Sequence, residues 1–88
     1  MTKFICTHTF PGGKFTAAQL QQLGHAAQQD PVIKGYRSFI NLAEGKAVCI
    51  MEAPHRQALA DWFAKVGMPV DAITRLEFEG DRGNIQAA

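Results

Sequence analysis

The side chains best suited to metal chemistry in this chain lie at alternating positions of two short apolar stretches. Cys6 and His8 are separated by one residue in the first stretch, and Cys49 and Met51 by one residue in the second. Side chains two positions apart on a β-strand point to the same face of a sheet. If the two strands pair antiparallel, Cys6 comes close to Cys49, and one face offers two thiols, an imidazole and a thioether. We therefore predict a site for a soft or borderline ion such as zinc, Cu(I) or nickel, which is pH-dependent because a thiolate ligand must lose its proton.

The same side chains also have a purely structural interpretation. A cysteine on an apolar strand face is usually a small buried hydrophobic residue, which applies to Cys6 and Cys49 alike. His8 lies near the end of its stretch, where an imidazole serves either packing and solvation or ligand binding. Both interpretations stay open at the level of the sequence.

Glu52 is the carboxylate nearest to this pattern, and it precedes the start of a predicted helix. It lies three residues after Cys49 and therefore points to the opposite face of the strand. One interpretation is a cross-strand pair with Arg37 or a favourable charge near the helix N-terminus. The other is a metal ligand or a general base. The predicted metal set is therefore His8, with Cys6, Cys49 and Glu52 in support.

The hydrophobic pattern predicts four strands and two helices that would position these residues. A capping box at Thr16 and Gln19 starts the first helix, and Pro31 ends it near residue 29 or 30. Pro54 fits the first turn of the second helix, and Gly67 fits the residue that follows its end. The predicted strands cover residues 3–9, 36–42, 47–52 and 73–79, with a hairpin turn at 43–46.

The predicted order β-α-β-β-α-β is that of a ferredoxin-like α+β sandwich, a four-stranded antiparallel sheet with both helices on one face. Strands 1 and 3 would be central, and neither of their faces is polar. Two helices cover only one face, so a second copy of the chain, placed sheet to sheet by two-fold symmetry, would cover the other. One predicted face carries Phe4, Cys6, Tyr36, Ile40, Ala47, Cys49 and Met51, and the other carries Ile5, Phe39, Val48 and Ile50.

Three segments of the chain together resemble one bacterial family, over roughly residues 3–79. They are Phe4–Pro11, Cys49–Pro54 and Gly67–Ile73. The chain is similar to the ferredoxin-like domain-of-unknown-function family that includes small nickel-binding proteins. This resemblance implies a dimeric ferredoxin-like fold and, for some members, nickel binding. His8 is at a first-strand position similar to a histidine of those members, and Met68 stands where they tend to carry another histidine.

Length and charge narrow the classes of protein further. Eighty-eight residues make a single domain, predicted at 1–80 with a polar tail at 81–88, and the net charge of +1 comes without a basic patch. We therefore expect no nucleic-acid partner. No apolar run of roughly 18 residues predicts a membrane span, and the N-terminus lacks a signal-peptide core, so we expect a cytoplasmic protein with reduced cysteines.

Three hypotheses about function follow. The first is a dimeric protein that binds nickel, zinc or copper through His8 and its neighbours. The alternative is a small-molecule binder or enzyme of the dimeric α/β-barrel kind, with His8, Tyr36, Arg37 and Trp62 lining a cleft between sheet and helices. The third is an interaction module whose open sheet face docks a partner. No nucleophile, base and orienting residue form a recognisable set. The first hypothesis is favoured over the alternative because of the family resemblance.

Overall fold

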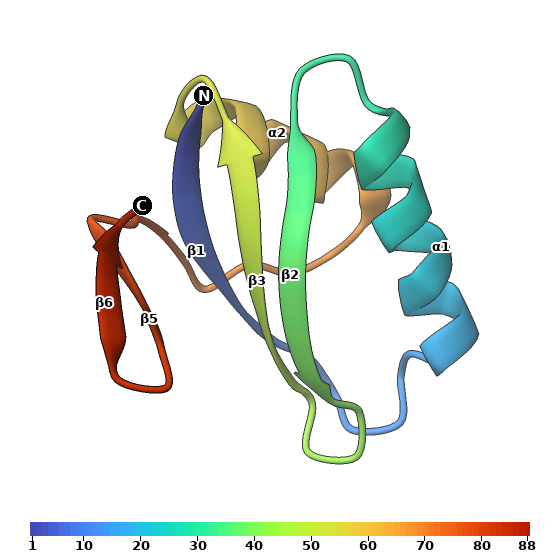
Figure 1. The fold of residues 1–88 in the computed structure, drawn as a ribbon. Coiled ribbons are helices and arrows are strands. Elements are labelled where there is room, and N and C mark those ends of the chain that lie inside the picture. The colour runs from blue at the N-terminus through green and yellow to red at the C-terminus, as the bar shows by residue number, and fades with distance from the viewer.

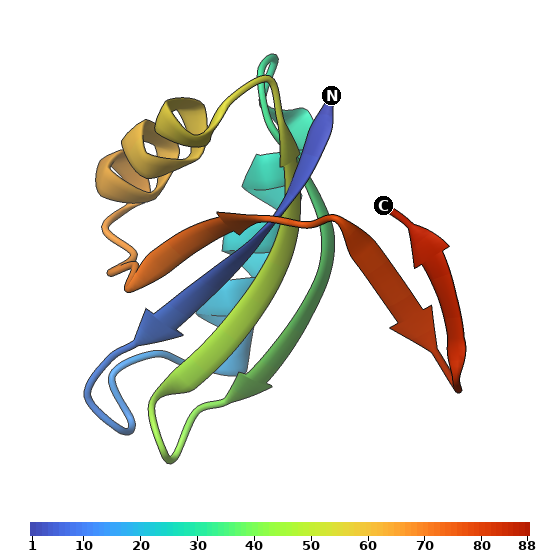
Figure 2. The ribbon, with the colours of Figure 1, turned by 90° about the vertical axis from the view of Figure 1, so that its left-hand side faces the viewer.

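The computed structural model describes residues 1–88, and its first six elements follow the predicted order. The sheet order is β2-β3-β1-β4 with every pair antiparallel, so β1 and β3 are central, as predicted. Both helices lie on one face of this sheet (Figures 1 and 2). The elements are β1 (Thr2–Thr9), α1 (Ala17–Gln29), β2 (Lys34–Asn41), β3 (Lys46–Ala53), α2 (Arg56–Val66), β4 (Ala72–Arg75), β5 (Phe78–Asp81) and β6 (Asn84–Ala87).

The helix ends follow local sequence signals, with one correction. The Thr16 hydroxyl accepts from the Gln19 N–H at 3.1 Å and the Gln19 amide oxygen accepts from the Thr16 N–H at 2.9 Å, which confirms the capping box. Gly67 ends α2 with φ +75°, as predicted. Pro54, however, is not in the first turn. His55 is exposed and caps α2, because its Nδ1 accepts from the Ala58 N–H at 3.2 Å.

A β-bulge in β2 overturns the predicted position of Tyr36. Gly35 pairs with Met51 and Arg37 with Ile50, so Tyr36 has no partner in the ladder. One extra residue moves a side chain to the other face of the sheet. Tyr36 is 56% exposed, and the Lys3 ammonium lies 4.2 Å from its ring centroid, on the side away from the helices.

The C-terminal segment differs from the single strand predicted at 73–79. β4 ends at Arg75, and β5 pairs only with β6, as a separate two-stranded hairpin. Arg82 and Gly83 have φ values of +52° and +89°, which is the two-residue turn that suits a right-twisted hairpin. Residues 81–88, predicted as a polar tail, therefore supply the turn and second strand of a hairpin that stands away from the sheet (Figure 2).

The hydrophobic core lies between the sheet and the helices and is small. Only 14 of the 88 residues are buried, so the core alone leaves little reserve of stability. Neither helix is long and apolar enough to span a bilayer. The core residues are Phe4, Cys6, Phe10, Ala27, Ile33, Ala47, Met51, Ala53, Leu59, Trp62, Phe63 and Met68.

The other side of the sheet, called the open face below, is covered by neither helix. Its side chains alternate along each strand with those that face the core. Ile5, Val48 and Ile50 are only half-buried, and Phe39 is 55% exposed. The open face consists of Lys3, Ile5, Thr7, Arg37, Phe39, Val48 and Ile50, with Tyr36 at its edge.

Candidate functional site

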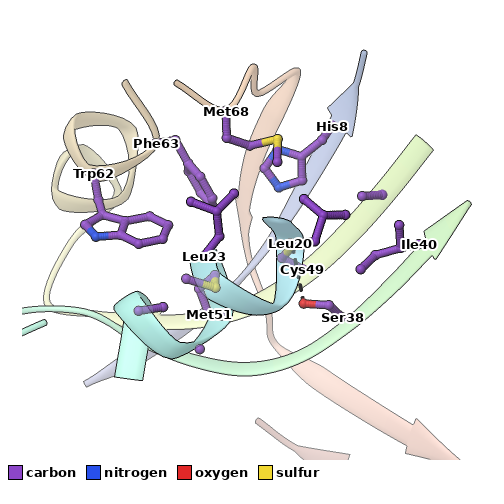
Figure 3. A pocket seen from close by; sticks show the side chains of 14 residues that line it. His8, Leu20, Leu23, Ser38, Ile40, Cys49, Met51, Trp62, Phe63 and Met68 are labelled. Atoms are coloured by element: carbon purple, nitrogen blue, oxygen red, sulfur yellow. Dashed lines mark hydrogen bonds between the residues drawn. The ribbon is translucent and has the colours of Figure 1, made fainter. Parts of the chain in front are cut away.

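A cavity of about 90 Å³ lies between the sheet and the two helices, and we call it the His8 cavity. β1, β2 and β3 contribute side chains from the face that the helices cover, and α1 and α2 supply the walls (Figure 3). Most of the lining residues are apolar, so the few polar atoms that reach the cavity are the candidates for binding. The lining residues are His8, Leu20, Leu23, Gly24, Ala27, Gly35, Ser38, Ile40, Ala47, Cys49, Met51, Trp62, Phe63 and Met68.

His8 presents an unpartnered nitrogen in this apolar setting. The residue is 1% exposed, and its Nδ1 lies 2.7 Å from the carbonyl oxygen of Pro69. A carbonyl only accepts, so Nδ1 carries the proton and donates it, and Nε2 is left with a free lone pair. Nε2 has no hydrogen-bond partner. The ring packs edge-on against Phe63, with centroids 4.8 Å apart, and Met68 lies beside it in Figure 3.

Burial holds the His8 imidazole in its neutral form. Desolvation lowers the pKa of His8 below its ordinary value of 6.5, and the hydrogen bond to Pro69 and the charge of Asp71 oppose this shift without cancelling it. A neutral imidazole is the form that binds a metal ion. No proton therefore has to leave Nε2 at neutral pH before it acts as a ligand.

The lowered pKa of His8 predicts that the metal-free protein loses stability in mild acid. The unfolded chain binds a proton at His8 near pH 6.5, but the folded chain does so only at lower pH, so the unfolded state holds more protons between these values. The contribution of neutral His8 to the free energy of unfolding should therefore be complete above about pH 6.5. This contribution should decrease as the pH drops toward the pKa of His8 in the folded chain. Urea unfolding at about pH 7.5 and 5.5, with chelator, measures this. An identical pH slope in His8→Phe would assign the effect to other groups.

The two cysteines lie directly opposite each other on β1 and β3, as predicted, and no disulfide joins them. Cys6 is completely buried, and burial raises the pKa of its thiol to about 12. Burial also raises the pKa of the Cys49 thiol, although the Ser38 hydroxyl donates to its sulfur at 3.4 Å. Only Cys49 lines the His8 cavity, so it is the thiol that a bound species can reach.

Glu52 lies away from the cavity, on the other side of β3. Its partners across the ladders are Lys3 on β1 and Lys34 on β2. The Arg37–Glu52 pair considered from the sequence does not form, because the β2–β3 register places Arg37 opposite Ile50 and Lys34 opposite Glu52. The Arg37 guanidinium instead lies 5.0 Å from the Phe39 ring centroid.

The four predicted metal ligands thus do not come together in one place. His8 and Cys49 line the cavity, Cys6 is enclosed in the core, and Glu52 is on the far side of the sheet. No group of three or more histidine, cysteine, aspartate or glutamate side chains is arranged to hold a metal ion. The thioethers of Met51 and Met68 line the cavity with His8 and were not among the predicted ligands. Met51 already belonged to the alternating pattern, but only the fold brings Met68 there.

The predicted ligand cleft of the alternative hypothesis is also divided by the sheet. His8 and Trp62 line the cavity, but Tyr36 and Arg37 line a separate groove at the open face. The alternation of β2 would have kept Tyr36 with the core residues had the strand been regular. The structure therefore does not favour an enzyme or binding protein that uses all four side chains.

Comparisons with known proteins agree with this fold. A family model described as nickel responsive protein, SCO4226-like, matches residues 4–76. A crystal structure of SCO4226 from Streptomyces coelicolor A3(2) superposes with a TM-score of 0.72 at 22% identity, covering 89% of this chain and 99% of that one. At that identity the likeness concerns the fold. No curated protein matches the chain.

Proposed function

Because this chain belongs to the SCO4226-like family of nickel responsive proteins, we propose that it binds a transition-metal ion of the nickel, zinc and copper class, with His8 Nε2 as a ligand. The observation that carries this proposal is the buried Nε2 without a partner. Histidines that ligate metals almost always donate their other ring N–H to a carbonyl or carboxylate, as His8 does to Pro69. An unpaired buried polar group costs about 1–3 kcal/mol, which a bound ion would offset.

The remaining donors of the cavity are sulfur atoms. Cys49 offers a thiol, and Met51 and Met68 offer thioethers. Imidazole suits nickel, zinc and copper, and sulfur ligands shift the preference toward soft ions. These residues fit an ion that accepts one nitrogen and several sulfur atoms. They do not form a site of three or more histidine, cysteine or carboxylate ligands within one chain. A bound ion would supply free energy to the native state, because the unfolded chain does not preassemble the donors.

Metal analysis tests this proposal directly. The purified chain is dialysed against Ni²⁺, Zn²⁺ or, without oxygen, Cu(I), and its metal content and melting temperature are measured. We expect about one retained ion per chain for at least one metal. At 100 times its Kd the ion should add about 2.7 kcal/mol to the free energy of unfolding. His25→Ala removes an exposed histidine of α1 and is the control that should keep full uptake. Failure to retain any of the three metals would refute the proposal.

The proposal extends to the assembly: a ferredoxin-like domain that pairs through the open face into a homodimer of the dimeric α/β-barrel kind. The strand order β2-β3-β1-β4, the apolar open face and the small core support it. Sedimentation equilibrium should then give twice the chain mass of 9.6 kDa. A cytoplasmic location belongs to the same proposal and is supported by the two unbridged thiols.

A further inference from the structure

The β5–β6 hairpin is held to the rest of its chain by few contacts. Its strands pair only with each other. At its base the Lys3 ammonium binds the Glu79 carboxylate at 2.7 Å, and the Leu76 N–H donates to the Lys3 carbonyl at 3.0 Å. Beyond that base the hairpin projects from the body of the molecule (Figures 1 and 2). An isolated two-stranded hairpin is marginally stable in water, so this one needs another surface to pack on.

One side of the hairpin is apolar and has no partner in its own chain. Phe78 pairs with Ala87 and Gly80 with Ile85, so these four residues share one side. Ile85 lies across Gly80, where its Cδ1 would be 2.8 Å from an added Cβ. Phe78 is 61% exposed and Ile85 67% exposed, among the highest values for large apolar side chains in the molecule. Apolar residues clustered in this way mark an interaction surface.

A groove of about 490 Å³ separates the hairpin from the open face. The open face contributes Arg37, Phe39 and Ile50 to its lining, and the hairpin contributes Phe78 and Glu79. Figure 2 shows the hairpin set apart from the strands of the sheet. The hairpin turns mainly its polar side to this groove, with Glu79, Asp81, Asn84 and Gln86, and Ile85 does not line it. The apolar side is therefore not used up by packing on the open face of its own chain.

We propose that the hairpin is an intersubunit arm, which in a two-fold dimer lays Phe78 and Ile85 on the open face of a second copy of this chain. The inference rests on the proposed homodimer and identifies the segment that completes its interface. Two-fold symmetry makes every such contact twice, so each chain gives one arm and accepts one. The arm lies outside residues 4–76, the region that the family model matches.

The charges of the two surfaces and the area of the open face both indicate that the hairpin packs on a second copy of this chain. The open face carries Lys3 and Arg37 beside the single carboxylate of Glu52, whereas β5 carries Glu79 and Asp81. The Lys3–Glu79 bond shows that a basic residue of this face attracts a carboxylate of β5. Arg37 has no carboxylate partner within its own chain. From the rise and spacing of strands, the open face has a flat footprint of roughly 450 Å². A standard interface buries about 800 Å² per partner, so the sheet alone is small for a stable dimer and two arms enlarge it.

The test measures the dimer dissociation constant of the full chain by sedimentation, with two double variants on opposite sides of the arm. Phe78→Ser with Ile85→Ser removes the apolar side. Asn84→Ser with Gln86→Ser alters the polar side of the same hairpin and is the matched control. Loss of two buried apolar anchors should raise the dissociation constant about 100-fold, and the control should leave it unchanged. The near-ultraviolet circular dichroism of the buried Trp62 verifies that each variant is folded.

Ile50→Arg, in the middle of the open face, separates this inference from the dimer itself. If Ile50→Arg dissociates the dimer and the apolar double variant does not, the dimer stands and the arm is refuted. Equal weakening by both double variants would reflect general disorder of the hairpin and would also overturn the arm. A wild-type chain that sediments as a monomer at every concentration would remove the dimer and the arm together.

Discussion

His8→Phe is expected to unfold at a higher denaturant concentration than the wild-type chain and to retain no metal. Phenylalanine keeps the edge-on contact with Phe63, and its larger ring has the His8 cavity of about 90 Å³ to occupy. The substitution removes a buried nitrogen without a partner, which is worth about 1–3 kcal/mol, and gives up one hydrogen bond to Pro69 worth about 1 kcal/mol. Pro69 is exposed, so its carbonyl can turn to water. We expect a net gain of about 1 kcal/mol in the free energy of unfolding.

A gain in stability with a loss of binding is typical of a residue kept for function. Urea unfolding of the metal-free variant, with metal analysis of the same preparation, measures both effects. His25→Phe introduces the same ring on the exposed side of α1 and should change neither quantity appreciably. A His8→Phe protein that keeps its metal would remove His8 from the site. One that is strongly destabilised would assign His8 a packing role instead.

Gly45→Ala should cost about 3 kcal/mol or more and lower the melting temperature by at least roughly 12 °C. Gly45 has φ +70°, and an added Cβ would lie 1.8 Å from the carbonyl oxygen of Phe10. The Phe10 N–H donates to the Gly45 carbonyl at 2.9 Å. The turn before β3 therefore contacts the backbone that follows β1 directly. Alanine adds the strain of a left-handed backbone, about 1–2 kcal/mol, and forces these two segments apart.

Gly13→Ala is the matched control for this substitution. Gly13 also has a positive φ of +79°, but an added Cβ there meets nothing within 4 Å. It should cost only the backbone strain of about 1–2 kcal/mol. Thermal unfolding of the two variants compares them, and equal losses would show that the close approach at Phe10 is relieved without cost. The turn also matters for the site, because it sets the end of the ladder in which His8 pairs with Ala47.

Patterns within the sequence were sufficient to predict the first six elements and the central ladder. The capping box at Thr16 and the glycine at the end of α2 are local signals, since their hydrogen bonds join residues close in the chain. Cys6 was predicted opposite Cys49 because β1 and β3 are regular, alternating strands that pair antiparallel. For the same reason the face shared by Phe4, Cys6 and Met51 was predicted correctly.

The positions of the remaining candidate residues depend on contacts between distant parts of the chain. A single bulge, which alternation does not reveal, moved Tyr36 across the sheet. The register of β2 with β3 placed Lys34, rather than Arg37, opposite Glu52. The break after Arg75 turned a predicted strand and tail into a hairpin, because Phe78 found its ladder partner in Ala87 rather than in β1.

The chemistry of the site depends most on contacts between distant residues. The Pro69 carbonyl that fixes the His8 tautomer is 61 positions away, and Met68 reaches the cavity only through the loop after α2. Sequence patterns report the face of one element at a time. The free nitrogen of His8 is a product of how two elements dock, and docking is settled by packing across the whole core.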